Sequence, residues 1–269
     1  MLIVAKAGGN VLKDGVPDPV LQDLAATVAA HRVVFVHGGG VEVTDIATRL
    51  GKPQTFVVSP QGFRSRYTDR ETVDIYTMVM VGKLNAEIVA ALERRGVAAV
   101  GLSGLDGRLL QATRKKRLII VDERGRRRVI DGGYTGTITA VNTTLLALLL
   151  DHGFVPVVAP VASSEEYEPL NVDGDRSAAA VAGFLKAEKL VLLTDVEGLI
   201  LNDQIVPKLN AYEARELLPQ IGPGMITKIY ASLEALEKGV DEVIITSGLI
   251  EKPISSAIEN TCGTVIRRG

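Results

Sequence analysis

The sequence predicts an α/β protein built around a mostly parallel sheet, and two observations support this. Short apolar runs rich in Val, Ile and Leu alternate along the chain with segments of helical periodicity, the order typical of strand–helix–strand units. Several of these runs are apolar almost throughout, as expected of strands that are buried on both faces. The 269 residues, 46% of them hydrophobic, suffice to bury a large core.

The strands and helices follow one another in a regular order. We expect strands at Leu2–Ala7, Arg32–His37, Thr55–Ser59, Val97–Leu102, Phe154–Ala159, Leu190–Thr194, Glu242–Ser247 and Thr264–Ile266, where the apolar runs lie. We expect helices between them at Pro19–Ala30, Val41–Leu50, Arg70–Arg95, Leu145–His152, Arg176–Ala187, Ala211–Leu217 and Lys228–Lys238.

The longest expected helix, Arg70–Arg95, has clear boundary signals. Thr68-Asp69-Arg70-Glu71 has the pattern of a capping box, and Gly96 is a natural stop. Apolar residues recur within it at helical spacing, namely Val73, Tyr76, Met80, Leu84, Ile88 and Leu92. This stripe predicts a face that packs in the core or at a subunit interface.

The composition excludes several classes of protein. The single cysteine, Cys262, rules out an internal disulfide, and three histidines leave little for a zinc site, so we expect no protein-bound metal. The N-terminus lacks the basic and apolar regions of a signal peptide. The longest uncharged run, Gly132–Leu150, contains Gly, Asn and several Thr and is a poor membrane span. We therefore expect a cytoplasmic protein.

One segment departs from the even mixture of charges. Between Arg114 and Arg128 the net charge is +6, in a chain whose total is −2. Apolar runs flank a turn at Asp122–Gly125, which predicts a basic β-hairpin. Its eight cations are Arg114, Lys115, Lys116, Arg117, Arg124, Arg126, Arg127 and Arg128. Such a patch is either a solvated surface or a docking site for an anionic partner. RNA is disfavoured because the hairpin has no aromatic side chain on which a base could stack.

Three glycine-rich loops indicate anion binding. They are Lys6-Ala7-Gly8-Gly9-Asn10, His37-Gly38-Gly39-Gly40 and Gly222-Pro223-Gly224-Met225. Glycine lets backbone N–H groups approach an anion closely, and a helix that follows adds a positive field. The Walker pattern and the protein-kinase motifs are absent, and the dinucleotide fingerprint is incomplete.

The shortage of histidine favours one kind of chemistry. Phosphoryl transfer to a carboxylate needs no general base, because a carboxylate is already ionised at pH 7. The enzyme must instead hold two anions together and neutralise the transferring group, for which lysines on glycine-rich loops are suited.

The ordered motifs resemble those of the amino acid kinase family over nearly the whole chain. They are K-x-G-G at Lys6–Gly9, H-G-G-G at His37–Gly40, R-Y-T-D at Arg66–Asp69, V-G-K-L-N at Val81–Asn85, G-L-S-G at Gly101–Gly104, N-V-D-G-D at Asn171–Asp175, L-T-D-V-E-G at Leu193–Gly198 and G-P-G-M-x-x-K at Gly222–Lys228. The resemblance implies a three-layer α/β/α sandwich in a single domain. Its residues 1–170 would form an amino-acid lobe, and its residues 171–269 a nucleotide lobe.

The resemblance also implies roles for individual residues. Lys6 and Lys228 match the lysines that stabilise the transferring phosphoryl group, and Asp175 matches the aspartate that orients them. Asp175 is equally placed to cap the helix expected from Arg176. The substrate contacts match Gly39, Gly40, Arg66 and Asn171, and the nucleotide contacts match Gly8, Gly9, Thr194, Asp195, Gly198 and Gly224. ATP would be the co-substrate, with Mg²⁺ held by its phosphates, and the long helix would form a homodimer.

Within the family, the nearest branch is the acylglutamate-kinase type, and two substrates compete. Tyr67, Asp173 and Gly174 and the basic hairpin resemble the kinases that act on α-aminoadipate or glutamate carried on LysW, a small acidic carrier protein of lysine and arginine biosynthesis. The alternative is a kinase of free N-acetylglutamate. A second alternative, a catalytically silent sensor on the same fold, is disfavoured by the presence of Lys6, Lys228 and Asp175.

Overall fold

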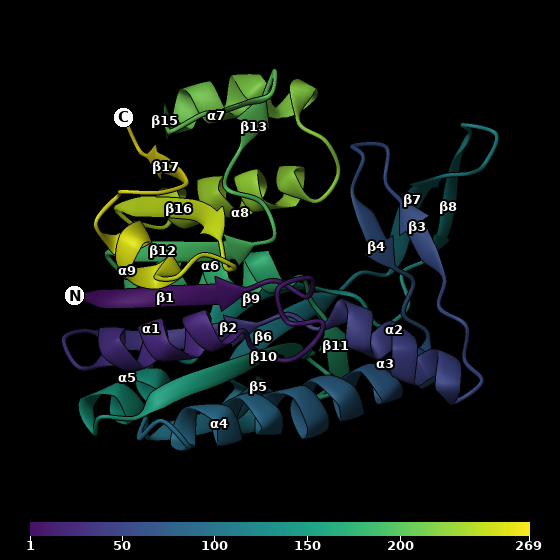
Figure 1. Ribbon diagram of the computed structural model, residues 1–269. Helices are drawn as coiled ribbons and strands as arrows, with labels where there is room; N and C mark the ends of the chain where they lie inside the picture. The colour runs from purple at the N-terminus through teal and green to yellow at the C-terminus, as the bar shows by residue number, and fades with distance from the viewer.

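Eleven strands form one large central sheet in the computed structural model, which describes residues 1–269 (Figure 1). In chain order they are β1 (Leu2–Ala7), β2 (Arg32–His37), β5 (Ala99–Gly104), β6 (Leu110–Arg114), β9 (Gly136–Val141), β10 (Val155–Ser163), β11 (Pro169–Asn171), β12 (Lys189–Thr194), β15 (Lys208–Asn210), β16 (Glu242–Ser247) and β17 (Thr264–Arg267). The spatial order is β15-β17-β16-β12-β1-β2-β10-β6-β9, and β5 and β11 also pair with β10.

The middle of this sheet is parallel, as the sequence predicts. Strand β1 pairs in parallel with β2 on one side and with β12 on the other, and β2 pairs in parallel with β10. Antiparallel pairs occur toward the edges, where β9 pairs with β6 and β17 with β16. The carboxyl ends of the central strands therefore meet at one edge of the sheet.

Helices cover both faces, which gives three layers. Ile3 and Ala5 of β1 belong to a core with α1 (Asp18–Val28), α4 (Ala86–Glu93) and α9 (Pro253–Ile258). Leu2 and Val4 belong to the opposite core, with α5 (Thr143–Asp151), α6 (Gly174–Leu185) and α8 (Met225–Glu237). Successive residues of β1 thus face opposite helical layers. The predicted α/β/α sandwich is confirmed.

Two hairpins stand away from the sheet at one end (Figure 1). One is β3 (Phe56–Val58) with β4 (Arg64–Arg66), and the other is β7 (Arg117–Val121) with β8 (Arg127–Asp131). The second confirms the predicted basic hairpin; its turn is held by Asp122, whose Oδ1 accepts hydrogen bonds from the Arg124 and Arg126 amides. Strand β3 contacts β7, so the two hairpins lie side by side.

The long helix has three parts. They are α3 (Arg70–Thr77), a π-helix at Met78–Asn85 and α4. All six residues of the predicted apolar stripe are buried, so the core interpretation is confirmed. The helix Arg70–Glu93 contains an 18-residue window with a mean hydropathy of 1.4, long and apolar enough to span a membrane, but core helices of soluble proteins meet the same criterion.

The predicted capping box is wrong by one residue. Asp69 is the N-cap, and its Oδ1 accepts a hydrogen bond from the Thr72 amide at 2.8 Å. Thr68 is fully buried instead, and its hydroxyl accepts a hydrogen bond from Asn171. Gly96 follows the helix with φ of +75°, as a helix stop requires.

The remaining elements complete the two halves of the chain. They are α2 (Gly40–Arg49), the small hairpin of β13 (Ile200–Leu201) and β14 (Gln204–Ile205), and α7 (Ala211–Leu217). The helix expected from Lys228 begins three residues earlier, at Met225, directly after Gly224. Lys228 is therefore in the first turns of α8 rather than at its start.

Candidate active site

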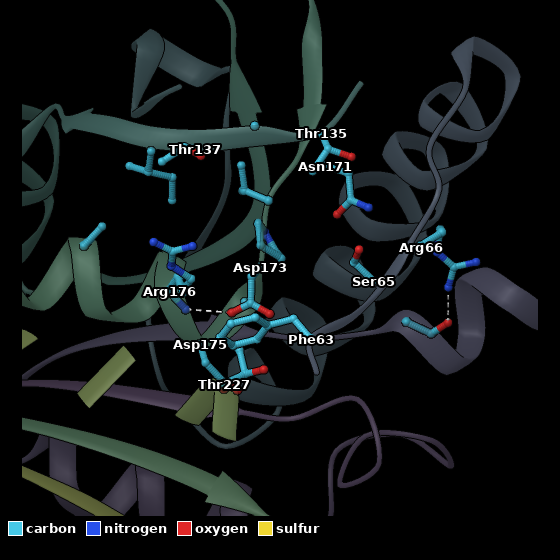
Figure 2. Close-up of a pocket in the computed structure, with 18 of the residues that line it drawn as sticks. Phe63, Ser65, Arg66, Thr135, Thr137, Asn171, Asp173, Asp175, Arg176 and Thr227 are labelled. Carbon is cyan, nitrogen blue, oxygen red and sulfur yellow. Dashed lines mark hydrogen bonds between the residues drawn. The ribbon is translucent and has the colours of Figure 1, made fainter. Parts of the chain in front are cut away.

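A cleft of about 700 Å³ opens at the carboxyl ends of β1 and β2. Its walls come from the loops after these two strands, the start of α6, residues along α8, the start of β9 and both projecting hairpins. Figure 2 shows part of its lining, with Arg66 on one side and Asp175 and Thr227 on another. Strand β1 connects to β2 on one side and lies beside β12 on the other, so the cleft is at a point where the sheet order reverses.

Lys6 and Asp175 line this cleft, and Lys228 pairs with Asp175 beside it. The Lys6 Nζ is 2.7 Å from Oδ1 of Asp175, and the Lys228 Nζ donates a hydrogen bond of 2.9 Å to Oδ2. Strand alternation explains the meeting, because Lys6 shares with Leu2 and Val4 the face of β1 that α6 and α8 cover. Two lysines around one carboxylate leave a net charge of +1 beside the cleft.

Asp175 is ionised in this setting. Its side chain is 6% exposed, and burial alone would raise its pKa. The charges of Lys6 and Lys228 outweigh burial and bring the pKa of Asp175 to about 2.

Asp173, not Asp175, caps α6. The Oδ1 of Asp173 accepts a hydrogen bond from the Arg176 amide at 2.9 Å, and the helix begins at Gly174 rather than at Arg176. The interpretation of Asp175 as the helix cap is therefore wrong. Since Asp173 takes the capping role, both oxygens of Asp175 face lysines.

The first two glycine loops lie against each other. A Cβ on Gly38 would be 2.8 Å from the Gly9 nitrogen, and one on Gly9 would be 3.2 Å from the Gly40 nitrogen. The N–H groups of Gly9 and Gly39 have no acceptor in the chain, and Gly40 begins α2. Unpaired amides at a helix N-terminus form an anion site. Gly8 lies next to this anion site, and a Cβ on Gly8 would be 3.6 Å from the Lys6 Nζ.

Arg66 and Asn171 line the other side of the cleft. Arg66 is 7% exposed and donates to the Gly40 carbonyl at 2.7 Å, to the Thr44 hydroxyl at 2.9 Å and to Gln54. All three acceptors are neutral, so its charge has no carboxylate partner, and burial lowers its pKa. Asn171 donates to Thr68 and keeps its amide oxygen toward the cleft region. An incoming carboxylate would complete this arrangement.

Of the expected nucleotide residues, Gly9 lines the cleft, whereas Gly8, Thr194, Asp195, Gly198 and Gly224 lie outside its lining. Asp195 accepts hydrogen bonds from Asn10 at 2.9 Å and from Thr194 at 3.0 Å, which joins the end of β12 to the first glycine loop. Gly198 packs against Thr264, where a Cβ would be 2.8 Å from the hydroxyl, so its place in the fold explains the glycine. Gly224 is exposed with φ of +84° at the start of α8.

The eight cations of the basic hairpin do not all face solvent. Arg114 stacks over Tyr134 at 4.1 Å and donates to the Gly133 carbonyl, and Lys115 lines the cleft, where burial lowers its pKa. Arg126 and Arg128 pair with Asp122. Four exposed cations have no ion-pair partner: Lys116, Arg117, Arg124 and Arg127.

Some residues of the cleft were not singled out from the sequence. Arg64 lines it, and Arg176 lies there paired with Glu234. Lys115 was expected with the cations of the docking surface, but it lines the cleft instead. Arg64 alternates with Arg66 along one short strand, which is a signal that strand periodicity could have provided. No such signal predicts the inward direction of Lys115, because its two neighbours in the charge run differ: Arg114 packs on Tyr134, and Lys116 is exposed.

Comparisons with known proteins show the family of the chain. A model of the amino acid kinase family matches residues 1–247. A Metallosphaera sedula protein named LysW-aminoadipate/LysW-glutamate kinase is 47% identical over 96% of this chain and 97% of its own. A Cenarchaeum symbiosum protein that bears this name provisionally is 52% identical over the full length of both. A crystal structure of smu.665 from Streptococcus mutans UA159 has the same fold, with a TM-score of 0.80 and 24% identity over 100% of this chain and 99% of its own.

Proposed function

Since this chain belongs to the amino acid kinase family, we propose that it uses ATP to phosphorylate the side-chain carboxylate of α-aminoadipate or glutamate attached to the carrier protein LysW. The product would be an acyl phosphate, which serves lysine biosynthesis and, with glutamate as acceptor, arginine biosynthesis. A relative 47% identical over nearly its whole length carries this activity in its name.

The single observation that carries the kinase assignment is the Lys6–Asp175–Lys228 group beside unpaired glycine amides. In the proposed reaction, a carboxylate oxygen of the acceptor bonds to the γ-phosphorus as the bond to the β–γ bridging oxygen breaks. No proton moves, because the attacking carboxylate is ionised. The two lysines and the Gly9 and Gly39 amides neutralise the charge on the transferring group.

The proposed roles divide the cleft between two substrates. Arg66 and Asn171 would hold the acceptor, with the Arg66 guanidinium pairing with its non-reacting carboxylate. Thr194, Asp195, Gly198 and Gly224 would contact the nucleotide from the β12 side. The amino-acid lobe is then residues 1–170 and the nucleotide lobe residues 171–269, joined along the β1–β12 pair.

Mg²⁺ would enter with the nucleotide. The acidic side chains at the centre of the cleft already have partners, because both oxygens of Asp175 face lysines and Asp173 caps α6. The phosphate oxygens and water are ligands that Mg²⁺ prefers. The protein's part is to hold the phosphates, not the ion. We further propose a cytoplasmic homodimer that pairs through the long helix.

The exposed cations of the basic hairpin would dock the acidic carrier. The basic hairpin borders the cleft, and three of its exposed cations have no ion-pair partner: Arg117, Arg124 and Arg127. A positive arm beside the reaction site would steer and orient a negatively charged carrier.

The test is ADP release with Mg-ATP and three acceptors in separate assays. They are LysW loaded with α-aminoadipate, LysW loaded with glutamate, and free N-acetylglutamate. Turnover confined to the carrier assays supports the proposal, and their ratio identifies the preferred amino acid. Turnover with N-acetylglutamate alone would overturn the proposal of a carrier-bound substrate. ATP binding without turnover in any of the three assays would overturn the proposed kinase activity.

A further inference from the structure

His37 is completely buried at the end of β2, and the proposed reaction does not use it as a base. Its Nδ1 is 2.9 Å from the Gly38 carbonyl oxygen, and its Nε2 is 3.2 Å from the Nδ2 of Asn85. Alternation along β2 explains the placement, since His37 faces the layer opposite to Val34 and Val36. Burial lowers its pKa to about 4, so the ring is neutral at physiological pH.

The contacts assign the protons of this pair. A carbonyl oxygen only accepts, so Nδ1 of His37 carries the hydrogen and donates it to Gly38. The Nε2 atom must then accept, and it does so from Asn85. The Asn85 amide nitrogen also donates to the Val157 carbonyl at 2.9 Å, which fixes the orientation of this amide.

The hydrogen bond from His37 to the Gly38 carbonyl also sets the direction of the Gly39 N–H. The Gly38 carbonyl and the Gly39 N–H belong to the same planar trans peptide, so they point in opposite directions. A hydrogen bond that draws the carbonyl toward buried His37 turns the Gly39 N–H the other way. That N–H has no acceptor in the chain, and Gly39 lines the cleft.

We propose that His37, itself held by Asn85, is a positioning residue that aims the Gly39 amide at the anion in the active-site cleft. This rests on the proposed phosphoryl transfer only for the identity of the anion. A misdirected amide would still permit both substrates to bind but would stabilise the transferring group less.

The π-helix at Met78–Asn85 packs against both His37 and the loop at Gly39. A Cβ on Gly39 would be 2.2 Å from the Leu84 side chain and 2.7 Å from the Met80 sulfur, so the loop packs directly on this segment. Hydrogen bonding to the fifth residue places Met80 and Asn85 one turn apart, so that Met80 lies against Gly39 and Asn85 holds His37. The same irregular segment therefore sets the position of the loop and the orientation of its peptide.

The kinetic test compares His37→Phe with His37→Asn. Phe fills the ring volume but donates nothing, whereas the Asn amide nitrogen can replace Nδ1 as the donor to Gly38. We expect His37→Phe to lower kcat about tenfold or more, with both KM values within about twofold, and His37→Asn to recover most of the loss. His152→Phe is the matched control, because His152 also contacts a carbonyl, that of Leu148, but at an exposed helix end. An unchanged kcat in folded His37→Phe, or an Asn variant as slow as the Phe variant, overturns the proposal.

A measurement that leaves His37 itself unchanged covers the case in which His37→Phe does not fold. The chain has three histidines, so long-range proton–nitrogen NMR spectra can resolve each ring. We expect His37 to show the neutral Nδ1–H form throughout pH 5.5–8 and Asn85→Leu to disturb that signal. The Nε2–H form, or protonation within this range, overturns the proposal. Because this readout needs no substrate, it remains decisive if the wild-type enzyme fails to phosphorylate any of the three acceptors.

Discussion

At the scale of single residues, Asp175 determines how the site is charged. It is the one carboxylate between Lys6 and Lys228, and its own pKa of about 2 keeps it ionised. The resemblance assigned these three residues to catalysis, and the structure places them within ion-pair distance. The role of Asp173 as the helix cap could not be separated from that of Asp175 by sequence, because either carboxylate can begin a helix.

Replacing Asp175 by Asn should lower kcat about a hundredfold, because two ammonium groups would then face each other without a carboxylate to orient them. Steady-state kinetics with the carrier substrate measures this. Asp173→Asn is the control, since Asn caps a helix as well as Asp does and should leave kcat within about twofold. Equal losses in both variants would contradict the assignment.

The free energy of unfolding in acid should depend on the ion pairs of Asp175 with Lys6 and Lys228. The folded-state pKa of Asp175 is depressed, so its stabilisation is present above pH 4 and is lost as the pH falls toward 2. The shift corresponds to about 2 kcal/mol of unfolding free energy. Urea unfolding of the wild type and Asp175→Asn should differ most at pH 5–7 and converge as the pH falls. A difference independent of pH would rule out the ionised carboxylate as its source.

At the scale of elements, the periodicity of apolar residues predicted most of the long strands and helices. The central strands, the long helix and the basic hairpin were found in this way. Strands β4, β11 and β15 were missed, and their three residues are too few to show a period; the longer strands β6 and β9 and helix α9 were missed as well. The π-helix had a signal that was not used. The residues of the predicted stripe from Tyr76 to Leu92 are spaced by four throughout, and in a regular α-helix such a stripe drifts around the axis. A wider turn at Met78–Asn85 brings it back.

The basic hairpin should act through its exposed charges. Reversing Arg117, Arg124 and Arg127 to Glu should raise KM for the carrier about tenfold or more at low salt and leave kcat nearly unchanged. Wild-type KM should itself rise with ionic strength because exposed charges are screened. Reversal of three exposed cations elsewhere, Arg94, Lys208 and Lys252, changes the net charge equally. A similar KM increase in that control would show a general charge effect and contradict docking on this arm.

At the scale of the whole molecule, the sheet joins the two proposed lobes. Strand β1 lies between β2 and β12, and α6 contacts β1, β2 and β12 together. The sequence predicted the α/β alternation, but the strand order depends on which faces the helices bury, and no local pattern contains that information. For the same reason the inward direction of Lys115 emerged only from the folded chain.

Neither lobe should fold alone. Residues 171–269 without β1 would leave the edge of β12 unpaired and expose the α6 surface that packs on β1. We expect circular dichroism melts of the separate fragments 1–170 and 171–269 to lack a cooperative transition, and co-expression to restore one. A cooperative melt of fragment 171–269 by itself would show two independent domains.

Lys6 lies almost at the start of the chain and Lys228 near its end, and the two meet only through Asp175. A nascent or prematurely terminated polypeptide that stops before α8 has one lysine paired with one carboxylate, and so no surplus positive charge where the phosphates must rest. We therefore expect no ATP turnover from a copy that ends before α8.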